Sequence, residues 1–270
     1  MKGFMVKPMN NTPNQITICT AASPDWLEYV HIQLYSILKN NTSNSFIKYY
    51  ILTDTDSVTE EHLNLFRKLF CLYEGMFDVQ FIDIEESFNR LVASQNNVSE
   101  RYKRHALYRL FIPQCLTEDK VLYLDSDTIV CQDLSKLFSL DMKDWYVAGV
   151  MDTGIMPDHK KNIGMSENVD YFNSGVLIFN NKLIIEDNLF DEMLKLCNGE
   201  PLLGLDQDII NLVLSENSTE LNPRYNVSLS TVADIPQEHT AILHHAGKKP
   251  WDTDEAFRAD VWKEYYNECF

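Results

Sequence analysis

Short apolar runs alternate with amphipathic segments along this chain, and that order constrains the fold more than any other feature. Residues 16–20 read as a strand, and residues 23–38, opened by a serine and a proline, carry apolar side chains at helical spacing. The succession repeats with residues 46–52 and 58–72, and again from residues 79–84 onward. Strands that alternate with helices form a parallel sheet with helices packed on it. We therefore predict an α/β protein.

The size and composition of the chain suit one main domain. It has 270 residues, of which 45% are hydrophobic, and no linker or internal repeat divides it. We expect a loose leader over residues 1–14, a single domain over residues 15–270 and a closing helix over residues 252–270. Further strands are predicted at residues 121–124, 145–151, 171–180 and 241–244, and further helices at residues 99–115, 186–197 and 205–214.

The charge of the chain limits its partners. Twenty-three basic and 40 acidic residues give a formal net charge of −17, which argues against nucleic acid or an anionic membrane as the main partner. A phosphate ligand would need positive charge close to it to offset the acidic protein, and a metal ion with a few basic side chains would supply that charge. The densest basic cluster lies at residues 101–109. We expect most of it to form a solvated helix face, except Arg109, whose apolar neighbours imply a fixed partner.

Cysteine spacing and the N-terminus bear on the compartment. The six cysteines include no C-x-x-C pair, so reduced thiols are expected in place of zinc sites or disulfides. The sequence shows neither a secretory signal nor an apolar run long enough to cross a bilayer. We predict a cytoplasmic protein that makes at most transient contact with the inner face of the membrane.

Asp125 and Asp127 lie where the apolar run at residues 121–124 ends. Two carboxylates that leave a sheet at its carboxyl edge, one residue apart, can share a divalent cation that holds a diphosphate, because Mg²⁺ and Mn²⁺ prefer oxygen ligands. Asp-x-Asp also occurs at residues 54, 206 and 252, so the pattern alone leaves a purely structural role open. Asp54 precedes a capped helix start and Asp252 a terminal helix, which favours structural roles for those acids.

Five ordered segments carry a resemblance to a known family: HALYRL at residues 105–110, KVLYLDSD at 120–127, YFNSGVL at 171–177, LDQD at 205–208 and HHAGKKPW at 244–251. Across residues 16–251 the chain resembles the retaining glycosyltransferases of family 8, and looks most like bacterial enzymes that build lipooligosaccharide and related glycans. The resemblance implies a GT-A fold with a mostly parallel central sheet. A nucleotide-sugar half would occupy about residues 15–130, and an acceptor half with the metal-binding tail about residues 131–251.

The resemblance also implies a metal site. In the family, the matching residues Asp125, Asp127 and His244 bind Mn²⁺, which bridges the diphosphate of a UDP-sugar. A nitrogen ligand suits Mn²⁺ better than Mg²⁺, although Mg²⁺ also fits such a site. Lys249 is expected to contact the diphosphate, with Lys248 as the alternative.

Family matching assigns further residues to the donor, the acceptor and the chemistry. The donor-binding residues implied are Ala21, Ser23, Asp25, Trp26, Arg109, Ser126, Asn173, Ser174, Gly247 and Lys249. Gln207 and Asp206 are expected at the reacting face, and Asp152 near the acceptor. The family often reads uracil with an Asp and an Asn after the first strand, where this chain has Ser23 and Asp25. Base selectivity should therefore be weaker, with UDP still the expected nucleotide.

The family implies transfer with retained anomeric configuration. We expect a front-face route in which Gln207 stabilises the cationic sugar, because an amide is a poor covalent nucleophile. A double-displacement route would need Asp206 or Asp152 instead. Lys249 and Arg109 are expected to stabilise the charge that builds on the leaving diphosphate.

Together these features predict a metal-dependent enzyme that moves glucose or galactose from a UDP-sugar to a saccharide or glycoconjugate, in bacterial surface glycan synthesis. A catalytically silent nucleotide-sugar-binding protein is the alternative. A sugar nucleotidyltransferase is disfavoured, because it needs a Gly-rich basic loop after the first strand, where residues 21–24 read AASP.

Overall fold

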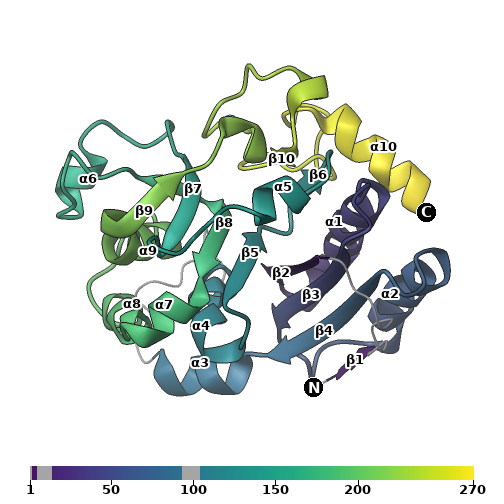
Figure 1. The fold of residues 1–270 in the computed structure, drawn as a ribbon, viewed down its shortest axis with the longest axis horizontal. Helices are drawn as coiled ribbons and strands as arrows, with labels where there is room; N and C mark the ends of the chain where they lie inside the picture. The colour runs from purple at the N-terminus through teal and green to yellow at the C-terminus, as the bar shows by residue number, and fades with distance from the viewer. Residues whose placement is uncertain (1, 5–13, 93–103) are drawn as a thin grey trace.

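A mixed sheet organises the molecule. The computed structural model describes residues 2–4, 14–92 and 104–270. They form an eight-stranded sheet in the order β1-β4-β3-β2-β5-β8-β7-β9 and a two-stranded sheet of β10 and β6, with helices around both (Figure 1). Four of the seven neighbouring pairs in the large sheet are parallel, and three are antiparallel. The predicted α/β class with a mostly parallel sheet is confirmed.

The elements have the following bounds. The strands are β1 Lys2–Phe4, β2 Gln15–Ala21, β3 Phe46–Thr53, β4 Phe77–Asp83, β5 Lys120–Leu124, β6 Thr128–Val130, β7 Val147–Met151, β8 Phe172–Asn180, β9 Ser218–Glu220 and β10 Ile242–His244. The α-helices are α1 Leu27–Lys39, α2 Glu60–Leu72, α3 Glu85–Leu91, α4 Ile112–Cys115, α5 Ser135–Phe138, α6 His159–Asn162, α7 Asn181–Glu186, α8 Leu189–Cys197, α9 Asp206–Leu214 and α10 Ala259–Cys269. The 3₁₀ helices are η1 Pro24–Trp26, η2 Arg104–Phe111, η3 Ser215–Asn217, η4 Pro223–Tyr225 and η5 Gln237–His239.

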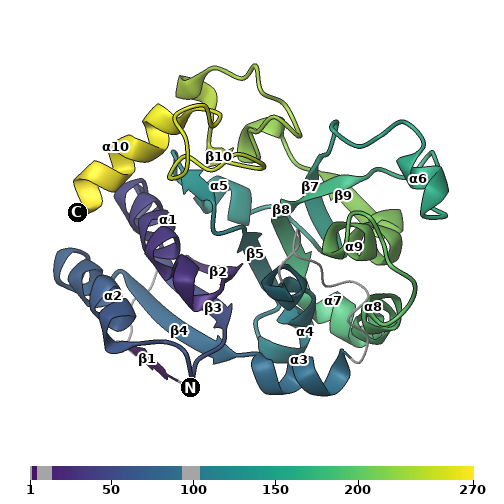
Figure 2. The same ribbon diagram turned by 180° about the vertical axis from the view of Figure 1, so that it is seen from behind.

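Two apolar cores lie on the two faces of the large sheet. Ile18 belongs to a core that also contains Val30 of α1 and Phe66 of α2. The next residue, Cys19, belongs to a second core with Leu107 of η2 and residues of α8 and α9. Successive side chains of a strand point to opposite faces, so a strand covered on both faces reads as a continuous apolar run. Figures 1 and 2 show α1, α2 and α10 grouped at one side of the molecule, and α7, α8 and α9 at the other.

The antiparallel strand β8 determines where polar residues gather. Strand β8 pairs with β5 so that Val176 lies opposite Leu124. The start of β8 therefore meets the end of β5, and the Asp125 N–H donates to the Gly175 carbonyl at 2.8 Å. This reversal brings the segment at residues 173–175 beside Asp125, although Asn173 lies 48 positions after Asp125 in the sequence.

The small sheet brings the C-terminal part of the chain to the same place. Strand β10 pairs antiparallel with β6, and His244 lies opposite Thr128. The N–H of His245 donates to the carbonyl of Asp127 at 3.0 Å. The end of β10 is thus fixed directly beside the turn that follows β5.

Several predicted boundaries differ from those observed. Residues 2–4, expected within a loose leader, form β1 and pair with β4; residues 5–13 lie outside the described part. Of the helix predicted at residues 99–115, the described part is the 3₁₀ helix η2 followed by α4, whose first turn contains Pro113, a position where a missing backbone N–H is tolerated. The helix predicted at residues 186–197 begins only at Leu189, after Asn188 adopts a φ of +56°.

The closing helix is shorter than predicted. Helix α10 begins at Ala259, after Arg258 adopts a φ of +50°, so residues 252–258 do not belong to it. All six cysteines are free. Among the helices of the described residues, none combines the length and apolar character needed to span a bilayer.

His31 in α1 predicts a pH-dependent stability. Its side chain is buried, and burial together with Lys68 lowers its pKa to about 4 from an ordinary value of 6.5. Between these values the unfolded chain binds more protons than the folded one, so the free energy of unfolding should fall as pH drops from 6.5 to 4, by up to about 3 kcal/mol. Urea unfolding across this range should show a shallower pH dependence for His31→Gln. The exposed His239→Gln variant is the control, and equal slopes for H31Q and the unsubstituted protein would refute the assignment.

Candidate active site

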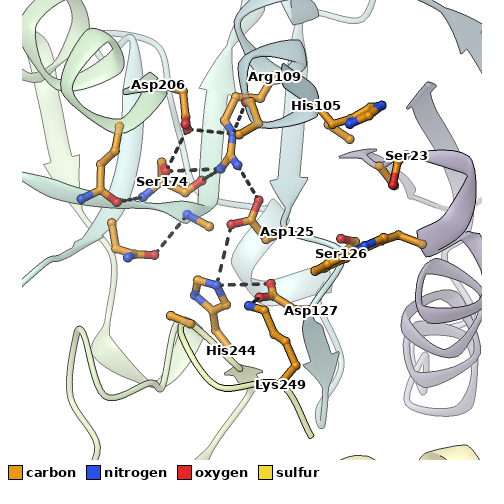
Figure 3. A pocket seen from close by; sticks show the side chains of 18 of the residues that line it. Ser23, His105, Arg109, Asp125, Ser126, Asp127, Ser174, Asp206, His244 and Lys249 are labelled. Atoms are coloured by element: carbon orange, nitrogen blue, oxygen red, sulfur yellow. Dashed lines mark hydrogen bonds and ion pairs between the residues drawn. The ribbon is translucent and has the colours of Figure 1, made fainter. Parts of the chain in front are cut away.

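A cavity of about 500 Å³ opens at the carboxyl ends of β2 and β5, beside the start of β8 (Figure 3). Thirteen of the sixteen residues that the sequence assigned to the site line it: Ala21, Ser23, Trp26, Arg109, Asp125, Ser126, Asp127, Asn173, Ser174, Asp206, Gln207, His244 and Lys249. Its size is in the range of cavities that hold small-molecule ligands. Six chain segments far apart in the sequence contribute to it.

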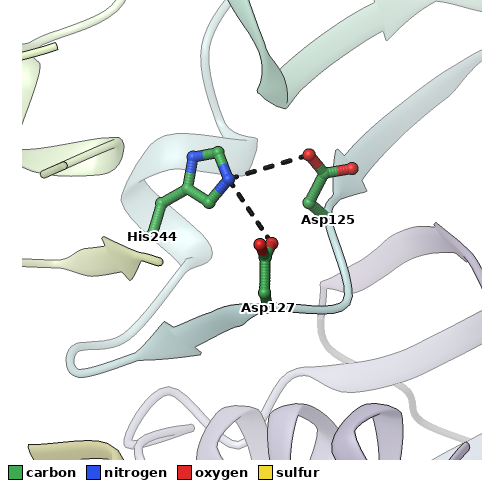
Figure 4. A group of neighbouring side chains, drawn as sticks. All are labelled: Asp125, Asp127 and His244. Atoms are coloured by element: carbon green, nitrogen blue, oxygen red, sulfur yellow. Dashed lines mark ion pairs between the residues drawn. The ribbon is translucent and has the colours of Figure 1, made fainter. Parts of the chain in front are cut away.

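Asp125, Asp127 and His244 converge at one wall of this cavity (Figure 4). The Nε2 atom of His244 lies 3.7 Å from Asp125 Oδ2 and 3.4 Å from Asp127 Oδ1. One ligand atom from each residue lies within 4.8 Å of the other two. The three residues that the sequence analysis grouped therefore lie close enough together to hold one metal ion.

A tight turn presents both carboxylates on the same side. The N–H of Thr128 donates to the carbonyl of Asp125 at 3.1 Å, which closes the turn between β5 and β6. The buried Gln33 of α1 donates from Nε2 to the Asp125 carbonyl at 2.5 Å and to Thr128 Oγ1 at 2.6 Å. Helix α1 thus fixes the turn from outside the cavity, a role that nothing in the local sequence around Gln33 indicates.

The donor set fits a divalent cation. Among the described residues, the buried Oδ1 atom of Asp127 has no hydrogen-bond partner and faces the imidazole of His244. A buried polar atom without a partner is costly, and a cation would satisfy it. Ligand atoms held at about 2.1 Å from one octahedral ion lie about 3–4 Å apart, which matches the separations observed. Two carboxylates and one imidazole are ligands that Mn²⁺ can bind.

Lys249 lies beside this set. Its Nζ contacts Asp127 Oδ2 and donates to the carbonyl of His245 at 2.8 Å. Burial works to raise the pKa of Asp127, but the positive charge of Lys249 outweighs it and holds that pKa well below its ordinary value. Asp127 is therefore ionised at neutral pH, as a metal ligand must be.

Arg109 is held between two carboxylates. Its guanidinium contacts Asp125 Oδ1 at 2.8 Å and Asp206 Oδ2 at 3.0 Å, and donates to the Ser174 carbonyl at 2.7 Å. Burial works to lower the pKa of Arg109, and the two carboxylates raise it further than burial lowers it. The fixed partner predicted for Arg109 is confirmed. These contacts hold the Asp125 and Asp206 carboxylates in place. A contact between Arg109 and the donor sugar stays a prediction.

Asp206 and Gln207 begin helix α9 and face the cavity. Burial raises the pKa of Asp206 to about 6, with Arg109 opposing and Asp125 adding to the shift. The Gln207 amide is held at both ends: its Oε1 accepts from the Ser174 N–H at 3.0 Å, and its Nε2 donates to Asp152 Oδ2 at 3.0 Å. The side chain of Gln207 is thus fixed before any ligand enters.

Three predicted site residues lie outside the cavity lining, and each has a structural reason. Asp25 lies in η1 and is exposed to solvent, whereas its neighbours Ser23 and Trp26 line the cavity. Gly247 is exposed and adopts a φ of +102°, which lets the chain turn between His245 and Lys249. Asp152 is buried and accepts hydrogen bonds from Asn173 and Gln207 at 3.0 Å each, so it holds these two cavity-lining side chains in place.

The structure brings further residues to the site. His105, expected on a solvated helix face, lines the cavity. The Oδ1 atom of Asn226 lies 2.9 Å from Nδ1 of His244. A Cβ atom on Gly175 would lie 2.2 Å from Cε1 of His244, so only glycine leaves room for the imidazole. Asn226 and His244 are 18 residues apart, a spacing with no local signature.

Comparisons with known proteins identify a family. The family model described as "Glycosyl transferase family 8" matches residues 17–255. The lipopolysaccharide 1,2-glucosyltransferase of Escherichia coli is 28% identical over 255 residues, which cover 87% of this chain and 73% of that protein. The glycosyltransferase GlyE of Streptococcus pneumoniae serotype 4 is 27% identical over 273 residues, which cover 95% of this chain and 62% of GlyE.

Solved structures show the same fold. The galactosyltransferase LgtC in complex with donor and acceptor sugar analogues has a TM-score of 0.73 at 22% identity, over 94% of this chain and 96% of that one. The bifunctional glycosyltransferase WbbM has a TM-score of 0.76 at 22% identity, but this chain spans only 50% of the WbbM chain. The GT-A fold is therefore shown.

A family model covers most of the chain, solved structures share its fold, and all five segments noted in the sequence line the cavity. The chain belongs to glycosyl transferase family 8.

Proposed function

We propose that this protein is a metal-dependent, retaining glycosyltransferase that moves a hexose, glucose or galactose, from a UDP-sugar to a saccharide or glycoconjugate acceptor in bacterial surface glycan synthesis. The observation that carries the proposal is the convergence of Asp125, Asp127 and His244 on one wall of a ligand-sized cavity. The name of the Escherichia coli relative, a lipopolysaccharide glucosyltransferase, supports the acceptor class.

The cavity offers distinct surfaces for the parts of a nucleotide sugar. Ser23 lies at one end of the cavity (Figure 3), and the backbone N–H of Trp26, whose indole could stack on a base, donates to the Ser23 carbonyl at 2.9 Å. Asp206 and Ser174 lie at the opposite end, with Asp125 between them and Ser23 (Figure 3). We infer that the base lies at the first end, the diphosphate beside the two carboxylates and the imidazole, and the sugar at the second end.

Charge stabilisation is the main catalytic demand. A divalent cation held by Asp125, Asp127 and His244 would supply Lewis-acid neutralisation of the diphosphate. Lys249 adds a fixed positive charge at the same wall. Arg109 keeps Asp125 oriented, so that the carboxylate need not reorganise during reaction.

The contacts of Asp206 and Gln207 favour the front-face route. One oxygen of Asp206 is engaged by Arg109 and by the Ser174 hydroxyl at 3.2 Å, which weakens it as a nucleophile. Gln207 is a neutral amide, clamped by Ser174 and Asp152. Its remaining lone pair can stabilise a cationic sugar without bonding to it. We propose that the acceptor hydroxyl attacks C1 from the face that the diphosphate leaves. The bond from C1 to the phosphate oxygen breaks, the bond to the acceptor oxygen forms, and the leaving phosphate takes the acceptor's proton.

Ligand-dependent thermal stability tests the proposal. UDP should raise the unfolding temperature when Mn²⁺ is present and have little effect with a chelator. A ligand at 100 times its Kd stabilises the folded state by about 2.7 kcal/mol. ADP and GDP are the matched controls for the base, and UDP release from UDP-glucose and UDP-galactose measures turnover. Equal stabilisation by UDP with and without metal would refute metal dependence. Binding of UDP-sugars without any release or transfer would identify a silent binding protein.

A further inference from the structure

We propose that Asn226 is a positioning residue that fixes which imidazole nitrogen of His244 faces the two carboxylates. This inference rests on the proposed metal role of His244. Asn226 is fully buried, and its Oδ1 lies 2.9 Å from His244 Nδ1, on the side of the ring opposite the carboxylates. It follows η4 in the chain and belongs to none of the segments that suggested the site.

The backbone holds the two side chains together. Val227, the residue after Asn226, donates its N–H to the carbonyl of Ile242 at 3.0 Å and accepts from the N–H of His244 at 3.0 Å. Two backbone hydrogen bonds, to Ile242 and to His244, therefore hold the segment that carries Asn226 against β10. Their approach does not depend on the side-chain hydrogen bond alone.

The orientation of the next amide, that of Asn173, is dictated by two fixed partners. Its Oδ1 lies 3.1 Å from the backbone N–H of Gly175, which can only donate. Its Nδ2 lies 3.0 Å from a carboxylate oxygen of Asp152, which accepts. Turning this amide over would place donor against donor and acceptor against acceptor, so Asn173 Oδ1 is an acceptor here.

The orientation of the Asn173 amide determines the orientation of the Asn226 amide and the tautomer of His244. Asn173 Oδ1 lies 2.9 Å from Asn226, which must therefore present its Nδ2 there and its Oδ1 to the imidazole. An amide oxygen accepts, so Nδ1 of His244 must carry a proton. In the neutral ring the lone pair is then on Nε2, the atom 3.4 Å from Asp127 and 3.7 Å from Asp125. A lone pair at that atom is what a metal ligand requires.

The same set of hydrogen bonds reaches the reacting end of the cavity. Asp152 Oδ2 accepts from Asn173 and also from Nε2 of Gln207, each at 3.0 Å. A change at Asn226 can therefore disturb Asn173. Through Asp152 it can also disturb the hydrogen bond that holds the Gln207 amide. We infer that the metal wall and the sugar end share one buried polar network.

Nitrogen NMR of the metal-free protein tests the tautomer directly. The protein is labelled with ¹⁵N-histidine, and His244 is assigned by the signals lost in His244→Gln. At a pH where the ring is neutral, Nδ1 should resonate as protonated and Nε2 as unprotonated. A neutral His244 with its proton on Nε2 overturns the proposal, whether or not the protein binds metal or transfers sugar.

A variant tests the consequence for metal binding. Asn226→Leu removes both hydrogen bonds at similar volume, and should shift the His244 proton toward Nε2 and weaken Mn²⁺ binding by about 10–100-fold in calorimetry. The matched control is Asn181→Leu, which removes a fully buried amide that donates to the Leu116 and Glu118 carbonyls. N181L should lower stability and leave Mn²⁺ affinity unchanged. An N226L protein that keeps both its tautomer and its Mn²⁺ affinity overturns the proposal.

Should N226L fail to fold, Asn226→Asp replaces it. A carboxylate still accepts from Nδ1 but faces Asn173 Oδ1 with a second acceptor. N226D should therefore keep the proton on Nδ1 while the Asn173 and Gln207 side-chain amide signals shift. Unchanged amide signals would contradict the shared network. If the unsubstituted protein shows the expected tautomer but binds no Mn²⁺, the proposed function fails while the hydrogen-bond assignment stands.

Discussion

Replacing Asp127 with asparagine is expected to abolish measurable Mn²⁺ binding and to lower kcat/KM for sugar transfer by at least about 10³-fold. Asparagine has the shape of aspartate but not its charge. The substitution removes an ionised ligand whose Oδ1 faces His244 without a hydrogen-bond partner among the described residues. A 10³-fold loss corresponds to about 4 kcal/mol of transition-state stabilisation, which one metal ion at a departing diphosphate can supply.

The chain provides a matched control for this substitution. Asp56 is also the second acid of an Asp-x-Asp tripeptide that follows a strand of the same sheet, but it is exposed and lies outside the cavity lining. Asp56→Asn should leave Mn²⁺ affinity and transfer unchanged. Titration calorimetry with Mn²⁺ and UDP, followed by UDP-release kinetics, measures both effects. Full activity in D127N would rule out a catalytic metal held by this carboxylate.

Replacing Gly175 with alanine is expected to have the second largest effect. An added Cβ would lie 2.2 Å from Cε1 of His244 and 2.8 Å from both ring nitrogens, so the imidazole must move. Gly175 is not among the glycines with positive φ, so alanine can adopt its backbone conformation and the obstacle is steric. We expect Mn²⁺ affinity to fall by about 100-fold, with about 1–3 kcal/mol of stability lost to overpacking.

Gly164→Ala separates the site effect from the stability effect. Gly164 has a φ of +79° and nothing within 4 Å of an added Cβ. Its substitution strains the backbone, at a cost of about 1–2 kcal/mol, without touching the cavity. G164A should unfold at a lower temperature and bind Mn²⁺ normally. If G175A and G164A bind Mn²⁺ equally well, the imidazole does not need the space that glycine leaves.

Periodicity predicted most elements of the N-terminal half, because strands buried on both faces read as continuous apolar runs there. It could not predict the direction of β8. Its run from Phe172 to Asn180 would read the same in a parallel or an antiparallel strand, and its pairing with β5 is a long-range contact. Nor could it separate η2 from an α-helix, since apolar spacing differs little between the two over eight residues.

Site residues could be predicted where neighbouring residues in the sequence marked them, and could not where only the folded structure brings them together. Asp125 and Asp127 were visible as acids at a strand exit, and Arg109 as a charge among apolar residues. His244 came only from the resemblance, because 117 residues separate it from Asp127. Asn226 carries no sequence signal for its contact with the imidazole. It acts through a hydrogen bond that exists only once the small sheet has formed.

The pairing of β10 with β6 has a consequence for synthesis of the protein. A ribosome adding about 5–20 residues per second makes His244 roughly 6–23 s after Asp127. During that interval a nascent chain can already have formed β2, β3, β4 and β5 with the acidic turn in place, yet it lacks the imidazole. We expect a nascent chain that still lacks His244 to hold metal poorly, so that donor sugars are not consumed before the segment that carries His244 has been made.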